Sequence, residues 1–158
     1  MKVYEFGKEH TRSFAMFQCA VEPWWVFKAS AEEMAKDYHN KTMIETGRCE
    51  VVQGDVSDLK LPADAFDLAT AFETIYFWPG LEKCFAQIAK VLKPGGYFMI
   101  CNESDGTDAT GLKFEKIIDG MKNHTVEEIE AALRAAVFSE VRSDHHPSKP
   151  WITVLARK

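Results

Sequence analysis

The chain lacks the features of several large classes of protein. Its 158 residues contain no apolar run of membrane-spanning length, and its first residues lack the charged and apolar regions of a signal peptide. Its four cysteines stand far apart without a C-x-x-C pair, which indicates reduced thiols. We therefore expect a cytoplasmic protein.

Positive charge is also scarce. The formal net charge is -5, and no basic stripe or polybasic block occurs, which argues against a nucleic-acid or anionic-membrane partner. No Gly-x-Ser-x-Gly sequence is present, which excludes hydrolase chemistry at a nucleophile elbow. The neighbouring His145 and His146 have no second ligand pair at a supporting spacing, so no metal site is predicted.

The length and the apolar content of the chain fit one globular domain over residues 1–158. Its central stretch, Val51–Glu103, reads as strand, loop, strand, helix, tight turn and strand. Phe66–Ala71 and Tyr97–Cys101 are short apolar runs of the kind that forms buried parallel strands. The stretch from Leu81 to Leu92 has apolar residues at helical spacing, and the following Lys93–Gly96 ends that helix. A strand, a crossover helix and a strand predict a right-handed parallel unit.

The flanking segments predict further elements. Ser30 and Glu33 have capping-box spacing and open a helix over about residues 31–46, and Thr125 and Glu128 open another. Apolar residues from Phe114 to Met121 indicate a short helix between them. Two strand-like runs near the C-terminus, residues 137–143 and 151–157, are joined by a turn too short for a crossover helix, so we expect them to pair antiparallel.

The first thirty residues are harder to interpret. Residues 2–7 resemble a short strand that ends in a glycine turn, whereas residues 13–20 form an apolar run that fits a buried strand or a short helix. The run Trp24–Phe27 is strongly strand-forming. Its aromatic side chains would offer apolar surface to a partner, which makes a homodimer one possibility.

Ordered motifs in the rest of the chain resemble class I S-adenosylmethionine-dependent methyltransferases, from about residue 40 to the C-terminus. They are Gly54-Asp55-Val56, Leu61-Pro62, Phe66-Asp67-Leu68, Ala71-Phe72-Glu73-Thr74, Phe77-Trp78-Pro79 and Leu92-Lys93-Pro94-Gly95-Gly96. The resemblance implies an α/β, three-layer Rossmann-like methyltransferase fold, with a mostly parallel sheet and a C-terminal antiparallel hairpin. It also implies a cytoplasmic enzyme that uses S-adenosylmethionine to methylate a small molecule.

The resemblance also places the cofactor across the carboxyl ends of the strands, as in other open parallel sheets. By position, Asp55 and Val56 would border the adenine. Ala71, Phe72 and Glu73 would lie beside the methionine portion and the transferable methyl group. The catalytic residues and the methyl acceptor are not implied.

The N-terminal part of this expected cofactor site departs from the family pattern. If residues 3–7 form the first strand, Glu5 and Gly7 fit the pattern, but Glu9 stands where glycine is expected. The acidic residue that binds the ribose is replaced by Lys28, and losing such an acceptor costs about 1.5–3 kcal/mol. Glu9 and Lys28 therefore predict impaired cofactor binding.

Two accounts of residues 1–39 stay open. They form either a degenerate version of the family's first motif or a foreign segment, because their order of strand, turn, apolar strand and aromatic loop also resembles the start of some α/β-hydrolase-type proteins. Two functional hypotheses follow. The chain is a small-molecule methyltransferase, or it is a non-catalytic, truncated or chimeric methyltransferase-like protein.

Overall fold

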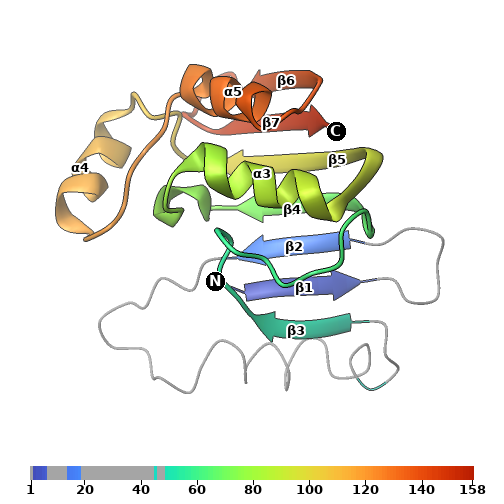
Figure 1. Cartoon of the computed structure of the whole chain (residues 1–158). Helices are drawn as coiled ribbons and strands as arrows, with labels where there is room; N and C mark the ends of the chain where they lie inside the picture. The colour runs from blue at the N-terminus through green and yellow to red at the C-terminus, as the bar shows by residue number, and fades with distance from the viewer. Residues whose placement is uncertain (1, 7–13, 19–44, 46–48) are drawn as a thin grey trace.

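A computed structural model describes residues 2–6, 14–18, 45 and 49–158. Its strands form one seven-stranded sheet in the order β3-β1-β2-β4-β5-β7-β6 (Figure 1). The strands are β1 (Lys2–Phe6), β2 (Phe14–Gln18), β3 (Cys49–Gln53), β4 (Phe66–Phe72), β5 (Leu92–Asn102), β6 (Glu140–His145) and β7 (Ile152–Arg157). Residues 14–18 are thus a strand rather than a helix.

The sheet is mixed, so the prediction of a mostly parallel sheet is wrong. Only β2 with β4 and β4 with β5 pair in parallel, whereas β1 is antiparallel to both of its neighbours. The connection from β1 to β2 spans only residues 7–13, which is shorter than the dozen or so residues of a parallel crossover. The same reason makes β6 and β7 antiparallel, which confirms the expected C-terminal hairpin.

The predicted parallel unit at the centre of the chain is confirmed. Helix α3 (Leu81–Val91) connects β4 to β5, and its apolar side chains are buried against the sheet. The predicted tight turn at residues 93–96 lies instead within β5, where the register against β4 shifts. Gly95 has a positive φ of 78° there, and Gly96 packs closely against the backbone of the preceding turn and β4.

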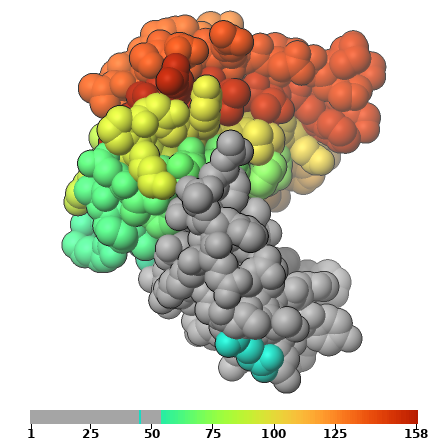
Figure 2. Space-filling model, turned by 90° about the vertical axis from the view of Figure 1, so that its right-hand side faces the viewer, coloured from blue at the N-terminus to red at the C-terminus, as the bar shows by residue number. Residues whose placement is uncertain are grey.

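Helices α3 and α5 (Val126–Ala135) cover the same face of the sheet, and the hydrophobic core lies beneath them (Figure 1). Trp78 stacks on Phe98, and Phe85 and Phe138 pack around the same ring. Of the three expected layers, the described part of the chain shows two, the sheet and the α3–α5 layer. Figure 2 shows the C-terminal segments, in orange and red, packed on the green and yellow segments as one body.

The remaining predicted elements have different outcomes. The capping box at the start of α5 is confirmed, with hydrogen bonds in both directions between Thr125 and Glu128. The short helix expected from Phe114 begins earlier, because the Asp108 carboxylate caps it, and it forms α4 (Ala109–Ile117). The expected helix over residues 31–46 and the aromatic run before it lie outside the described residues, except for Glu45.

Candidate functional site

The carboxyl ends of β2, β4 and β5 lie along one edge of the sheet, because these strands are parallel (Figure 1). We call this the carboxyl edge. Strand β4 ends at Phe72, which pairs with Cys101, and β5 ends one residue later at Asn102. The residues after these strands, from Glu73 to Tyr76 and from Glu103 to Ser104, form the polar part of the edge.

Glu73 connects the ends of β4 and β5. Its backbone N–H donates to the Cys101 carbonyl at 3.0 Å, and its carboxylate accepts from the Glu103 N–H at 2.6 Å. Its φ is 54°, a left-handed conformation that is uncommon for a residue other than glycine. Partial burial of the carboxylate raises the pKa of Glu73, and the charge of Glu103 acts in the same direction, although the hydrogen bond from Glu103 opposes both.

Tyr76 forms a second bond between the two strand ends. It belongs to the short helix η2 (Ile75–Phe77), and its hydroxyl accepts a hydrogen bond from the buried Ser104 N–H at 3.1 Å. Burial raises the pKa of Tyr76, and the charge of Glu73 raises it further, so the phenol stays protonated. The edge therefore holds a carboxylate beside a protonated phenol.

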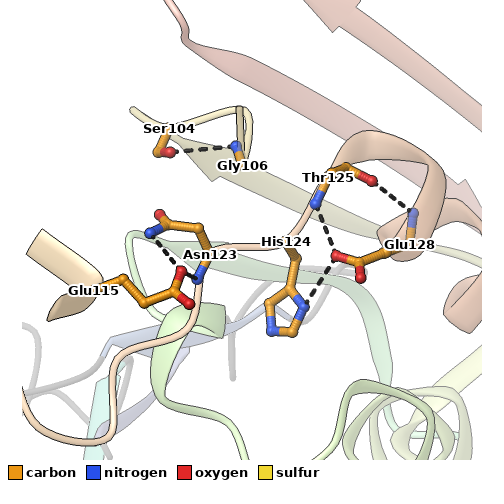
Figure 3. Close-up of polar contacts among 7 residues, drawn as sticks. All are labelled: Ser104, Gly106, Glu115, Asn123, His124, Thr125 and Glu128. Carbon is orange, nitrogen blue, oxygen red and sulfur yellow. Dashed lines mark hydrogen bonds and ion pairs between the residues drawn. The ribbon is translucent and has the colours of Figure 1, made fainter. Parts of the chain in front are cut away.

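The loop after β5 is fixed by its own polar side chains. Asp105 accepts hydrogen bonds from the backbone of Thr107 and Asp108, and the hydroxyl of Ser104 accepts one from Gly106 (Figure 3). The Ser104 hydroxyl also donates to the Asp108 carboxylate, which caps α4. This network positions α4 directly after the carboxyl edge.

Asn123 and His124 lie between α4 and α5 and are both buried. Figure 3 shows Asn123 turned toward Glu115 of α4, whose carboxylate accepts from the Asn123 backbone and amide nitrogens. Nδ1 of His124 lies 3.6 Å from the Glu128 carboxylate. Burial lowers the pKa of His124 and Lys122 lowers it further, against the opposing charge of Glu128.

Asp55 and Val56, predicted to border an adenine, follow β3. Asp55 is exposed and its carboxylate accepts the Ser57 N–H at 2.8 Å, a bond that lowers the pKa of Asp55. Val56 is buried and belongs to the hydrophobic core. Asp55 thus acts as a turn former at a strand end, and its role toward a ligand stays a prediction.

The other predicted cofactor residues are spread over the sheet. Ala71 is buried in the hydrophobic core, whereas Phe72 is 38% exposed at the carboxyl edge beside Glu73. Glu5 lies within the antiparallel strand β1, opposite Ala15 and Glu50, and not at the carboxyl end of a strand beside β4. Gly7, Glu9 and Lys28 lie outside the described residues. The structure therefore brings together Phe72 and Glu73 but not Glu5.

A hollow of about 540 Å³ lies at the opposite end of β4 and β5. It is lined by the Lys93–Asp67 ion pair and by apolar side chains that include Tyr97 and Leu155. It is therefore separate from the carboxyl edge.

Asn123 and His124 were not predicted from the sequence to belong to this region. They precede the capping box at Thr125 and have no periodicity or motif of their own. Their burial results from contacts of the segment between α4 and α5 with α4 and with the loop after β5, since Asn123 is bonded to Gly111 and Glu115 and the His124 backbone lies beside Gly106.

Comparison with known proteins identifies the family. Residues 13–100 match the model of the family described as methyltransferase domain, which is more than half of the chain. The chain belongs to the class I S-adenosylmethionine-dependent methyltransferase family. The match begins at residue 13, earlier than the resemblance that begins near residue 40, and it includes β2 but not β1.

Individual relatives agree with this family. The sterol 24-C-methyltransferase erg-4 of Neurospora crassa is 27% identical over 124 residues, covering 70% of this chain and 33% of that protein. A fatty-acid O-methyltransferase of Mycolicibacterium smegmatis is 40% identical over 50 residues, covering 32% of this chain and 18% of that protein. The chain thus spans a third or less of the length of these curated relatives.

A solved structure shows the same fold. The methyltransferase of Thermotoga maritima, described as S-adenosylmethionine-dependent and a possible histamine N-methyltransferase, superposes with a TM-score of 0.61 at 19% identity. The match covers 77% of this chain and 70% of that chain. At this identity the likeness supports the fold alone.

Proposed function

We propose that the protein binds S-adenosylmethionine at the carboxyl edge and transfers its methyl group to a small, largely apolar molecule. The observation that carries this proposal is the arrangement of Phe72, Glu73 and Tyr76 where β4 and β5 end, since ligands of open α/β sheets bind outside the carboxyl ends of the strands. The family uses this cofactor.

The residues that would hold the cofactor fit it in part. S-adenosylmethionine carries a positive sulfonium, so an exposed aromatic ring and a carboxylate are suitable neighbours for it. Phe72 and Glu73 supply these two groups, and Asp55 supplies a second carboxylate after β3. When bound, the cofactor supplies an activated methyl group, so the protein mainly aligns the acceptor and excludes water.

The antiparallel direction of β1 affects the part of the carboxyl edge at the ends of β2 and β3, where the adenosine portion would bind. Its direction places Lys2 opposite Gln18 and Gln53, the last residues of β2 and β3. None of these three residues has a carboxylate that could accept hydrogen bonds from the ribose hydroxyls. We therefore expect weaker binding of the adenosine portion, by about tenfold or more for each charged hydrogen bond that is missing.

The apolar character of the acceptor is supported by two observations. Phe72 presents an exposed aromatic ring at the edge. The relatives from Neurospora crassa and Mycolicibacterium smegmatis are named for sterols and fatty acids. The proposal covers the class of acceptor and not a particular compound.

A second candidate is a non-catalytic methyltransferase-like protein, present as a monomer or a homodimer. It is supported by the antiparallel β1 and by Glu9 and Lys28, which together remove the expected acidic and glycine positions. Such a protein would keep the fold, because the core lies between α3, α5 and the sheet rather than at the carboxyl edge.

Isothermal titration calorimetry with S-adenosylhomocysteine separates the two candidates without knowledge of the acceptor. Saturable heat at micromolar to millimolar ligand, weakened by Phe72→Ala, supports the proposed site. Tyr97→Ala is the matched control, because Tyr97 is equally exposed at the other end of the strands. The absence of heat, together with an unchanged melting temperature at millimolar ligand, would reject cofactor binding, because a ligand of the native state must stabilise it.

A further inference from the structure

Helix α4 carries its large apolar side chains on the outside. Leu112, Phe114 and Ile117 are 42%, 46% and 65% exposed, which is an unusual concentration within nine residues. A surface helix ordinarily turns its apolar residues toward the core. In Figure 1, α4 stands apart from the sheet and from α3 and α5.

The inward side of α4 is polar. Gly111 is buried and its carbonyl accepts the Asn123 amide, while Glu115, one turn later, accepts two hydrogen bonds from the same residue (Figure 3). The Asp108 carboxylate caps the helix start. Polar contacts therefore hold α4 in place with its apolar side outward, so this orientation is fixed by the fold.

The outward side of α4 also carries positive charge. Lys113 and Lys116 are exposed between the three apolar residues and form no ion pair within the part of the chain that the structure describes. The acidic residues of the helix and its cap, Glu115 and Asp108, are engaged in the inward contacts, and the exposed Asp119 lies beyond the helix end. The outward side is thus apolar and cationic, unlike the whole chain with its net charge of -5.

We propose that α4 docks the protein on an anionic lipid bilayer. Leu112, Phe114 and Ile117 would enter the interface between headgroups and acyl chains, while Lys113 and Lys116 would lie against the anionic headgroups. Charge favours this occupant over a second copy of the chain, because a symmetric contact through α4 would bring lysines together. The negative net charge of the whole chain predicted no anionic membrane partner. Salt screens charges that lie farther from the bilayer than a Debye length, so the attraction depends mainly on the charges of the surface that meets the membrane.

Docking through α4 would also place the carboxyl edge beside the bilayer. Only residues 103–108 separate the end of β5 from α4, and Ser104 forms hydrogen bonds both with Tyr76 at the carboxyl edge and with Asp108, which caps α4. An apolar molecule that leaves the bilayer would reach the edge without crossing water. The docking itself does not depend on cofactor binding, so the two proposals are tested separately.

Cosedimentation of the full chain with vesicles tests the docking. We expect binding to phosphatidylcholine vesicles that contain about one third phosphatidylserine and little binding to pure phosphatidylcholine. Each lysine near such a surface contributes about fivefold to partitioning, so Lys113→Glu with Lys116→Glu should weaken binding by at least about twentyfold. Phe114→Ser with Ile117→Ser should weaken it by about tenfold or more.

Matched variants distinguish α4 from the general surface. Lys83→Glu with Lys90→Glu makes the same change in net charge on the exposed side of α3, and Leu155→Ser removes an equally apolar exposed side chain from the sheet. Both should bind like the unchanged protein. Equal losses in the α3 and α4 variants, or no binding of the unchanged protein to anionic vesicles, would overturn the proposal. A dimer that dissociates in the Phe114→Ser/Ile117→Ser variant, without vesicle binding, would assign the surface to a second copy instead.

Discussion

The carboxylate of Glu73 accepts a hydrogen bond from the backbone N–H of Glu103 at 2.6 Å, across the ends of two neighbouring parallel strands. The bond is formed from a left-handed backbone conformation with a φ of 54°. Such conformations cost of order 1–3 kcal/mol and concentrate at functional sites. The position of this carboxylate at the carboxyl edge motivates the first prediction.

Glu73→Gln should reduce the affinity for S-adenosylmethionine more than the affinity for S-adenosylhomocysteine. The amide oxygen of glutamine can still accept from Glu103, but it has no charge to attract the sulfonium, which only the first ligand carries. For a carboxylate that is only partly buried the difference should be about fivefold. Calorimetry with both ligands measures it, and an equal loss for both would show that Glu73 does not contact the sulfonium.

Tyr76→Phe should destabilise the protein by about 1–3 kcal/mol, because it leaves the buried Ser104 N–H without its acceptor. Urea denaturation measures the change. Tyr97→Phe is the control, since Tyr97 is 39% exposed, and it should change the free energy of unfolding by less than about 0.5 kcal/mol. Similar values for the two variants would contradict the role of the Tyr76 hydroxyl.

Acidification should destabilise the fold through His124. The pKa of His124 is lowered below its unfolded value of 6.5, mainly by burial, so the unfolded state binds the proton more readily. The contribution of His124 to the free energy of unfolding is fully present above pH 6.5. It is lost as the pH falls from 6.5 through the lower pKa of the folded state, at a rate of at most about 1.4 kcal/mol per pH unit. His124→Gln should reduce this slope.

Urea denaturation at several pH values between about 5 and 7.5 measures the slope around the ordinary histidine pKa. His146→Gln is the comparison variant, because it removes an exposed histidine from the surface. If His124→Gln and the unchanged protein lose stability equally, the pH dependence belongs to other groups.

Gly96→Ala should destabilise the protein by about 1–3 kcal/mol through overpacking. A methyl group there would meet the Lys93 carbonyl at 2.9 Å and the carbonyls of Phe66 and Asp67 at 3.2 Å. Gly54→Ala is the matched control, because nothing lies within 4 Å of its added methyl group. Thermal unfolding of both variants distinguishes a specific clash from a general intolerance of alanine.

The elements that the sequence predicted well are those whose local signals agree. The strand at residues 66–71, the helix from Leu81 and the capping box at Thr125 each combine a periodic apolar pattern with suitable turn or cap residues. The same holds for the final hairpin, since a short connection allows only antiparallel pairing. These features depend on neighbours in the sequence, so the sequence reports them directly.

The direction of β1 and the start of α4 were predicted less well. Residues 2–6 form a strand as predicted, but the sheet was expected to be mostly parallel, whereas the short connection to β2 makes β1 antiparallel. Helix α4 begins at Ala109 because the Asp108 carboxylate caps it, while the apolar pattern alone pointed to a start near Phe114. In both cases a single local contact or connection outweighed a broader pattern.

Periodicity, turn chemistry and motif order in the sequence were enough to define the family, the central strand–helix–strand unit and the residues at the ends of β3 and β4. The three-dimensional arrangement was needed to see that Glu73 reaches the backbone of Glu103, that Asn123 and His124 are buried, and that α4 turns its apolar side outward. Each of these depends on contacts between different elements, 8 to 30 residues apart, whereas periodicity and capping residues report only the element in which they lie.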